Sequence, residues 1–222
     1  MAQCIWCGKK GLLLSVDRNK LCRNCQSIIY FDFRQRLRII QDSQKLIEKS
    51  KNFNTRIGRI DTLLEHVQAL KRYEDKNITT LKPPPSEVER SYLKFRSELI
   101  FENIVEEIDK IMNKAKLGLT PKTKMSEANK ALVKINERRR EIQGEDEINM
   151  VEGKEKEIKT FIHETQLNEF IDEAKKAEFK GQKARALDKY QEALYFLQTD
   201  EIDDSFQKEK IAEIKAKISE LT

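Results

Sequence analysis

The chain has 222 residues, of which 36% are charged and 38% hydrophobic, with only seven glycines and four prolines. This composition is typical of long solvent-exposed helices and argues against a compact α/β enzyme. No apolar run approaches the ~20 residues of a transmembrane helix, so we expect a mostly helical, cytoplasmic protein. Residues 1–60 hold thirteen basic and four acidic side chains, a net charge of +9, whereas the whole chain carries +5. This asymmetry indicates an electrostatic role for the N-terminal part.

All cysteines lie near the N-terminus in two CxxC pairs, Cys4, Cys7, Cys22 and Cys25. A CxxC turn brings two thiolates to one ion, and two such turns complete the tetrahedral sulfur shell of structural zinc. Disulfides are the alternative, but residues 1–3 show no apolar segment of a secretory signal. Because four thiolates leave no position for water, a catalytic zinc is disfavoured. We predict one structural zinc per chain.

The sequence between and after the pairs indicates how this segment folds. Residues 12–16 predict a strand followed by a turn, and residues 26–37 predict a helix that begins at the second pair. A helix N-terminus favours thiolates through its free N–H groups and its dipole. A CxxC turn, a hairpin and a helix that carries the second pair of ligands, in this order, resemble a treble-clef or zinc-ribbon type of Cys4 zinc finger. The resemblance covers residues 1–30 and implies a zinc-stabilised mini-domain.

A basic-faced helical hairpin is predicted over residues 25–76. Its first helix has two neighbouring apolar stripes. The first stripe consists of Ile29, Phe33, Leu37, Ile40 and Ile47, and the second of Ile28, Ile39 and Leu46. A break at residues 52–55, with Asn54 or Thr55 as the cap, leads into the second helix. Since a helix with so wide an apolar face contacts more than one neighbour, we expect a protein partner or a homo-oligomer.

Basic side chains provide an argument for nucleic-acid binding. If the first helix stays regular, its basic residues project within about 60° of one another, opposite the apolar stripes. The finger adds further charge, and the candidate contacts are Lys9, Lys10, Arg34, Arg38, Lys45, Lys49 and Arg56. Such a row can follow phosphates, with an affinity that falls as salt rises. A basic face opposite an apolar one is also typical of any solvated helix, so both interpretations stay open.

The remaining elements follow in chain order. Three consecutive prolines exclude a helix from the linker predicted at residues 77–85. Residues 86–143 predict a second helical hairpin, with Ser86 as its first cap and Thr120–Pro121 opening its second helix. Residues 144–153 are acidic and weakly patterned, which predicts an acidic linker. Residues 154–222 predict a three-helix bundle with breaks near Gly181 and Thr199 and a last helix over residues 205–221.

Small and large residues recur in this C-terminal bundle with the spacing of a helical hairpin. They are Ala174, Ala177, Gly181, Ala186, Tyr190, Ala193 and Leu194. The pattern resembles a single tetratricopeptide unit, with Gly181 in the turn. With a third helix it also resembles MIT domains, which implies a groove for a short helical peptide. The groove candidates are Ala177, Gly181, Tyr190 and Leu194, and a bundle that packs only on itself is the alternative.

No pattern of residues indicates an active site. His66 and His163 lie in separate helical regions, and His163 does not belong to an HExxH motif. Phosphate-binding glycine loops and nucleophile elbows are missing from the sequence. We therefore expect a non-enzymatic, zinc-binding helical scaffold or adaptor for protein–protein interaction. Nucleic-acid binding by the finger and the first helix is the alternative.

Overall fold

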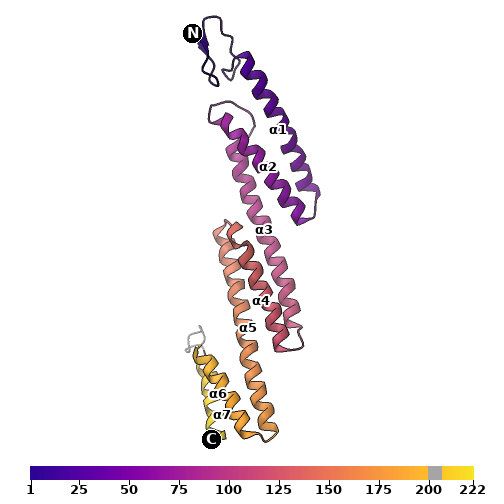
Figure 1. The fold of residues 1–222 in the computed structure, drawn as a ribbon, viewed down its shortest axis with the longest axis vertical. Helices are drawn as coiled ribbons and strands as arrows, with labels where there is room; N and C mark the ends of the chain where they lie inside the picture. Colours follow the sequence, from indigo (N-terminus) through magenta and orange to yellow (C-terminus); the bar gives the residue numbers. More distant parts are fainter. Residues whose placement is uncertain (200–206) are drawn as a thin grey trace. The chain divides into compact units, whose positions relative to one another are not determined.

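The computed structural model describes residues 1–199 and 207–222, and it confirms the mostly helical fold (Figure 1). Strands β1 (Ala2–Gln3) and β2 (Lys10–Gly11) form a small N-terminal sheet. The helices are α1 (Arg23–Lys49), α2 (Phe53–Glu74), α3 (Pro85–Lys116), α4 (Pro121–Arg138), α5 (Glu145–Phe179), α6 (Lys183–Thr199) and α7 (Lys208–Leu221), with a short 3-10 helix at Arg139–Glu141. Among the described helices, none is sufficiently long and apolar to cross a membrane.

The chain divides into two compact units. The first comprises Met1–Asn103 and Glu141–Glu147, and the second comprises Ile104–Arg140 and Ile148–Thr222. Helices α3 and α5 supply residues to both units, so neither unit is a single continuous stretch of sequence.

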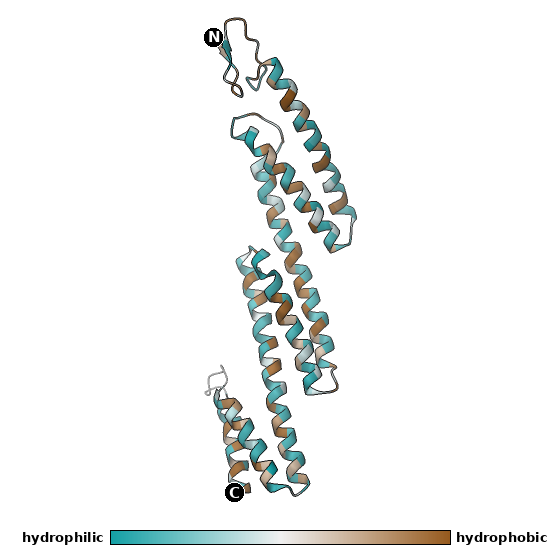
Figure 2. Ribbon diagram, viewed as in Figure 1, coloured by the Kyte–Doolittle hydropathy of each residue, from teal (hydrophilic) through white to brown (hydrophobic). Residues whose placement is uncertain are grey.

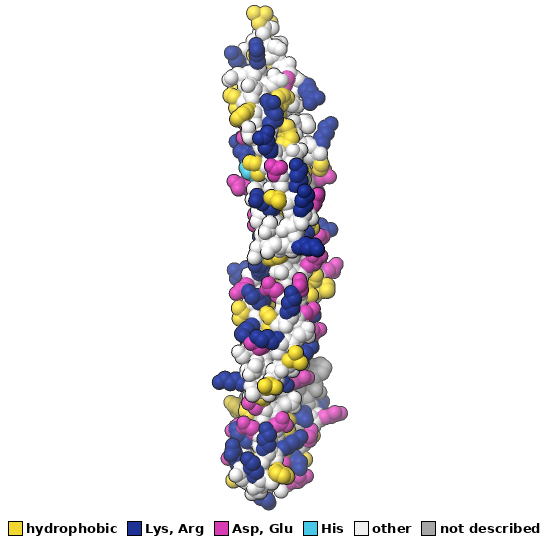
Figure 3. Space-filling view, turned by 90° about the vertical axis from the view of Figure 1, so that its right-hand side faces the viewer, with side chains coloured by type: hydrophobic (Ala, Val, Ile, Leu, Met, Phe, Trp, Pro, Cys, Tyr) yellow, Lys and Arg dark blue, Asp and Glu magenta, His cyan; other side chains and the backbone are white. Residues whose placement is uncertain are grey.

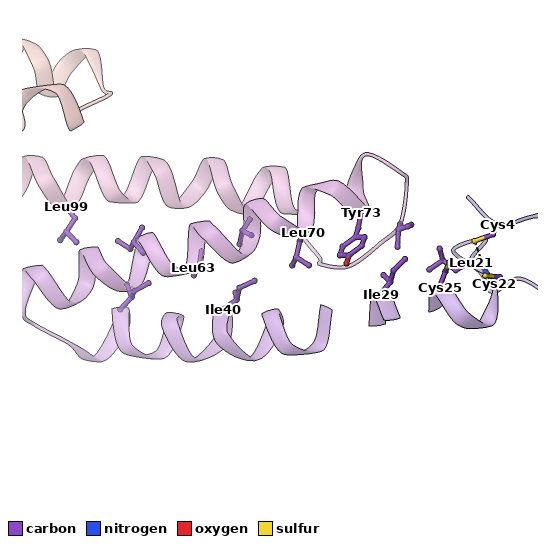
Figure 4. Close-up of a cluster of buried hydrophobic side chains, with 14 residues drawn as sticks. Cys4, Leu21, Cys22, Cys25, Ile29, Ile40, Leu63, Leu70, Tyr73 and Leu99 are labelled. Carbon is purple, nitrogen blue, oxygen red and sulfur yellow. Dashed lines mark hydrogen bonds between the residues drawn. The ribbon is translucent and has the colours of Figure 1, made fainter. Parts of the chain in front are cut away.

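The core of the first unit is formed by one face each of α1 and α2 and by the beginning of α3. Apolar residues recur at helical spacing along these helices (Figure 2) and meet in one cluster (Figure 4). Its members from the helices include Ile29, Ile40, Ile47, Ile60, Leu63, Val67, Leu70 and Leu99. The same cluster includes Cys4, Leu21, Cys22 and Cys25. The cysteine-bearing segment is therefore packed onto the helices through a continuous core.

Capping residues explain where two of the helices begin. Asn52 caps α2, because its Oδ1 accepts a hydrogen bond of 2.9 Å from the Thr55 N–H. The expectation of Asn54 or Thr55 as the cap was wrong, since both lie inside the first turn of α2. The prediction for α4 is confirmed: Thr120 accepts from the Thr123 N–H, and Pro121 is the first helical residue.

Residues 145–153 of the acidic linker predicted at residues 144–153 are helical. Helix α5 begins at Glu145, and its first turn holds Glu145, Asp146 and Glu147. Negative charges there stabilise a helix because they face the positive end of its dipole. Val151 is fully buried in this segment. The acidic run is therefore the beginning of a helix. The sequence did not predict this helix because its apolar residues recur too weakly there.

The C-terminal part of the second unit has its own core. The end of α5 packs with α6 and α7 around buried residues that include Ile171, Tyr190, Ala193 and Ile214. Gly181 lies in the turn between α5 and α6 with a φ of +67°, a conformation that side-chain-bearing residues avoid. Residues 205 and 206, the predicted start of the last helix, lie outside the described residues.

Candidate metal centre

The first CxxC pair lies on a tight turn enclosed by the small sheet. Strands β1 and β2 pair antiparallel, with Gln3 opposite Lys10, and return the chain beside itself. Inside this hairpin the Gly8 N–H donates to the Cys4 carbonyl oxygen at 2.9 Å. Gly8 has a φ of +74°, which glycine adopts without strain. The turn brings Cys7 back toward Cys4.

The second CxxC pair is placed by the start of α1. Cys22 is the residue immediately before the helix, and Cys25 lies in its first turn. The preceding loop is held by Asp17, whose carboxylate accepts from the Leu21 N–H at 2.8 Å and from the Tyr30 hydroxyl at 2.7 Å. Because Tyr30 belongs to α1, the helix itself fixes the loop that carries the second pair.

The four thiols form one cluster whose geometry suits a tetrahedral ion. All four Sγ atoms lie within 4.8 Å of one another, and Cys7 Sγ and Cys22 Sγ are 3.9 Å apart. A zinc–sulfur distance of about 2.3 Å implies sulfur–sulfur distances of about 3.8 Å in a tetrahedron. Cys4, Cys22 and Cys25 are buried and Cys7 is exposed. The predicted cluster is confirmed, it fits one zinc ion, and zinc as its occupant stays a prediction.

The thiols of Cys4 and Cys25 have very different affinities for protons. Burial raises the pKa of Cys4, but hydrogen bonds with the backbone of Cys7, Cys22 and Trp6 outweigh it and bring the pKa to about 6. One such bond is donated by the Cys22 N–H to Cys4 Sγ at 3.3 Å. Burial and hydrogen bonds with the other thiols raise the pKa of Cys25 to about 12. A divalent cation supplies the positive charge that lets all four ionise together.

The hairpin of this segment differs from the predicted one. Residues 12–16 form no strand, and only Val16 makes a single bridge, to Cys22. Leu12 and Leu13 are exposed in a loop. The observed strands instead flank the first CxxC pair and are two residues long each. Strands this short carry no periodic pattern that a sequence can reveal.

A polar network that sequence reasoning missed joins α1 to α2. Asp32 accepts hydrogen bonds from the Tyr73 hydroxyl at 2.8 Å and from Arg72 at 2.9 Å, and it pairs with Arg36 at 3.1 Å. Burial opposes ionisation of Asp32, but these hydrogen bonds outweigh it and lower its pKa. The Tyr73 ring also lies 5.2 Å from the Trp6 ring. The network therefore anchors the cysteine-bearing segment against the end of α2.

Most of the predicted basic contacts are on exposed positions. Lys9 and Lys10 are exposed beside the first CxxC pair, and the exposed residues of α1 include Arg34, Arg38, Lys45 and Lys49. On the face shown in Figure 3, dark-blue Lys and Arg side chains outnumber magenta Asp and Glu side chains near the N-terminal end.

Arg56 does not join this row. The helix breaks after Lys49, so Arg56 belongs to α2, and its guanidinium lies over the Phe95 ring at 5.4 Å. The prediction that grouped Arg56 with the α1 residues assumed an unbroken helix and is corrected here.

Two of the four residues predicted to line a partner groove in the C-terminal part are buried. Ala177 and Tyr190 are buried, and Leu194 packs against the same core. The Tyr190 hydroxyl donates to Glu178 Oε2 at 2.7 Å. Because α7 adds Ile214 to the core that contains Tyr190, the unit's own helices cover this side chain. Gly181 serves the turn, and the tetratricopeptide and MIT resemblances stay predictions.

No protein-family model, curated protein or solved structure matches this chain. Its function must therefore be inferred from its own residues.

Proposed function

We propose that the protein is a non-enzymatic, zinc-stabilised helical scaffold that binds a protein partner through one exposed apolar stripe of α1. The α1 stripe consists of Ile28, Phe31, Ile39 and Leu46, whose side chains are 60%, 62%, 36% and 38% exposed. At about 100° per residue, residues 28, 39 and 46 project within about 20° of one another, with Phe31 beside them. Exposed apolar side chains that gather on one side of a helix are typical of a protein-binding site.

Charge next to the α1 stripe indicates what kind of partner fits. Arg38 and Lys49 follow α1 about a quarter turn away from the stripe, and Arg34 lies about a third of a turn away. None of the three forms an ion pair with a carboxylate within residues 1–199 and 207–222. A partner helix with an apolar row and a flanking acidic row complements both features. We therefore infer an acidic amphipathic helix as the partner element.

The metal centre supports this proposal through its position. Cys25 lies one turn before Ile28, so an ion held by the four thiols fixes the end of the helix at which the α1 stripe begins. Four sulfur ligands leave no coordination position for a substrate. We assign zinc a structural role, in a reducing compartment such as the cytoplasm, where thiols persist.

Site-specific photo-crosslinking tests the proposal. A p-benzoylphenylalanine is placed at Ile39 in the native source and, as the control, at Tyr195, an aromatic residue of α6 that is 69% exposed. We expect one discrete adduct from position 39, none from position 195, and loss of the adduct when Ile28→Ser is added. An adduct with a second copy of the chain would show that the α1 stripe binds another copy of this protein and not a different partner. Equal labelling from both positions, or none, would refute the proposal.

Nucleic-acid binding is the second candidate, and the unpaired cations of α1 favour it. Polarisation of a fluorescent oligonucleotide is compared for the wild type and for Arg38→Glu/Lys49→Glu, with Lys122→Glu/Lys183→Glu as a control of equal charge change. Contact at α1 predicts that only the first variant loses affinity and that its dependence on salt becomes shallower. Equal losses in both variants would show nonspecific attraction.

A further inference from the structure

The first unit contains a cavity of about 900 Å³, and Arg34 is the residue of its lining that the proposed function already uses. Three separate segments line it: residues 17–19 before the second CxxC pair, the first part of α1, and the segment between α2 and α3. Residues far apart in sequence, such as Arg18 and Lys82, thus share one cavity. Its size falls within the range of small-molecule sites, about 300–1,000 Å³.

The cavity is electropositive. Arg18, Arg34 and Lys82 line it, and none of them forms an ion pair with a carboxylate in the described parts of the chain. Asp17 is the acidic residue of the lining, but both of its oxygens already accept hydrogen bonds, from the Leu21 N–H and the Tyr30 hydroxyl. Three cations against one engaged carboxylate favour an anionic ligand.

The lining also offers aromatic walls. Phe33 and Tyr30 supply aromatic surface. Asn19, only 9% exposed, donates to the Tyr30 hydroxyl at 2.9 Å and holds that ring in place.

We propose that this cavity binds a nucleotide, with its phosphate held by Arg34 and Lys82 and its base against Phe33. Phosphate oxygens accept several charge-assisted hydrogen bonds at once, which matches several cations in one site. A base stacks on aromatic surface whatever its identity. Inorganic phosphate alone fills a small part of the volume. This site is additional to the proposed protein-binding role. The nucleotide is either free in solution or part of a single-stranded nucleic acid.

Methyl NMR of the full-length, zinc-loaded chain with labelled threonines tests this site. The probes are inorganic phosphate, AMP, a six-nucleotide oligothymidylate and, as an anion without phosphate, a hexaglutamate peptide. We expect AMP or the oligonucleotide to shift the Thr79 and Thr80 methyl signals while those of Thr120 and Thr123 stay in place. Saturation by AMP identifies a free nucleotide as the source, whereas saturation by the oligonucleotide alone identifies a strand.

Charge variants separate this cavity from general attraction to a basic surface. Arg34→Gln/Lys82→Gln is expected to weaken binding of the effective probe at least about tenfold, since two charge-assisted hydrogen bonds are lost. The matched control Arg38→Gln/Lys45→Gln, outside the cavity, is expected to stay within about twofold. Equal weakening in both variants, equal shifts with hexaglutamate, or no shift with any nucleotide would overturn the proposal. Cross-linking at Ile39 tests the protein-binding proposal separately from nucleotide binding, because the α1 stripe does not line the cavity.

Discussion

Removal of one metal ligand separates the stability of the cysteine-bearing segment from that of the helices. In Cys22→Ser, a buried thiol at the residue before α1 becomes a hydroxyl group. Zinc contributes about 10–16 kcal/mol of apparent binding free energy in small structural sites, so one of four ligands accounts for about 3–4 kcal/mol. We therefore expect zinc affinity to fall about 100- to 1,000-fold, at about 1.4 kcal/mol per tenfold.

The helices are expected to survive this substitution. Serine is a favourable cap, and Cys22 makes no side-chain cap bond that would be lost. Beyond the first two turns of α1, the core retains Ile40, Ile47, Leu63 and Val67. Only residues 23–29 are expected to fray, so the ellipticity at 222 nm should fall by less than about a tenth.

Metal analysis, chelator competition and circular dichroism measure these effects together. Cys7→Ser is the matched variant, because it removes the exposed ligand and spares the buried core. It should lose metal to a similar extent and retain still more of the contacts around Cys25. Wild-type zinc affinity in Cys22→Ser would refute the four-sulfur site. Loss of half of the helical signal would show that the metal centre organises the whole first unit.

Three further predictions concern the helices. Burial opposes the ionisation of Asp32, but its hydrogen bonds outweigh this and lower its pKa. The ionised Asp32 carboxylate therefore stabilises the fold fully above its unfolded pKa near 4, and this stabilisation is lost as pH falls through its folded pKa. Asp32→Asn should lower the free energy of unfolding by about 1–2 kcal/mol in urea titrations at pH 7, and by progressively less below about pH 4. Tyr190→Phe removes the bond to Glu178 and should cost about 1 kcal/mol in thermal melts with zinc content unchanged; a larger loss would indicate repacking. Gly181→Ala should lower the free energy of unfolding because of the positive φ, whereas Gly153→Ala, which meets open space inside α5, should raise it, each by about 1 kcal/mol in thermal melts. Changes of the same sign would contradict the backbone argument.

Local features of the sequence predicted the cysteine cluster and most of the helices. The two CxxC pairs are sufficient because each places two ligands on one short turn. Helical periodicity located α1 to α4, since apolar residues must recur on the face that is buried. The acidic beginning of α5 was not predicted as a helix, because charge and not an apolar repeat stabilises its first turn.

Contacts between residues that are distant in sequence could not be predicted from local patterns. Asp32 and Tyr73 are 41 positions apart, and nothing in either local sequence specifies their hydrogen bond. Arg56 was misplaced for the related reason that a helix break rotates every residue after it. Tyr190 was expected to line a groove, but α7 adds Ile214 to the core that contains it.

The sequence by itself determined a helical chain with four clustered thiols, because ligand spacing and helical periodicity act over a few residues. Only the tertiary structure decided which apolar stripe of α1 is buried and which is exposed: Ile29, Ile40 and Ile47 pack against α2, while the α1 stripe beside them faces solvent. It alone brought Arg18, Arg34 and Lys82 into one cavity. Both outcomes depend on which helix faces meet, and long-range packing decides this.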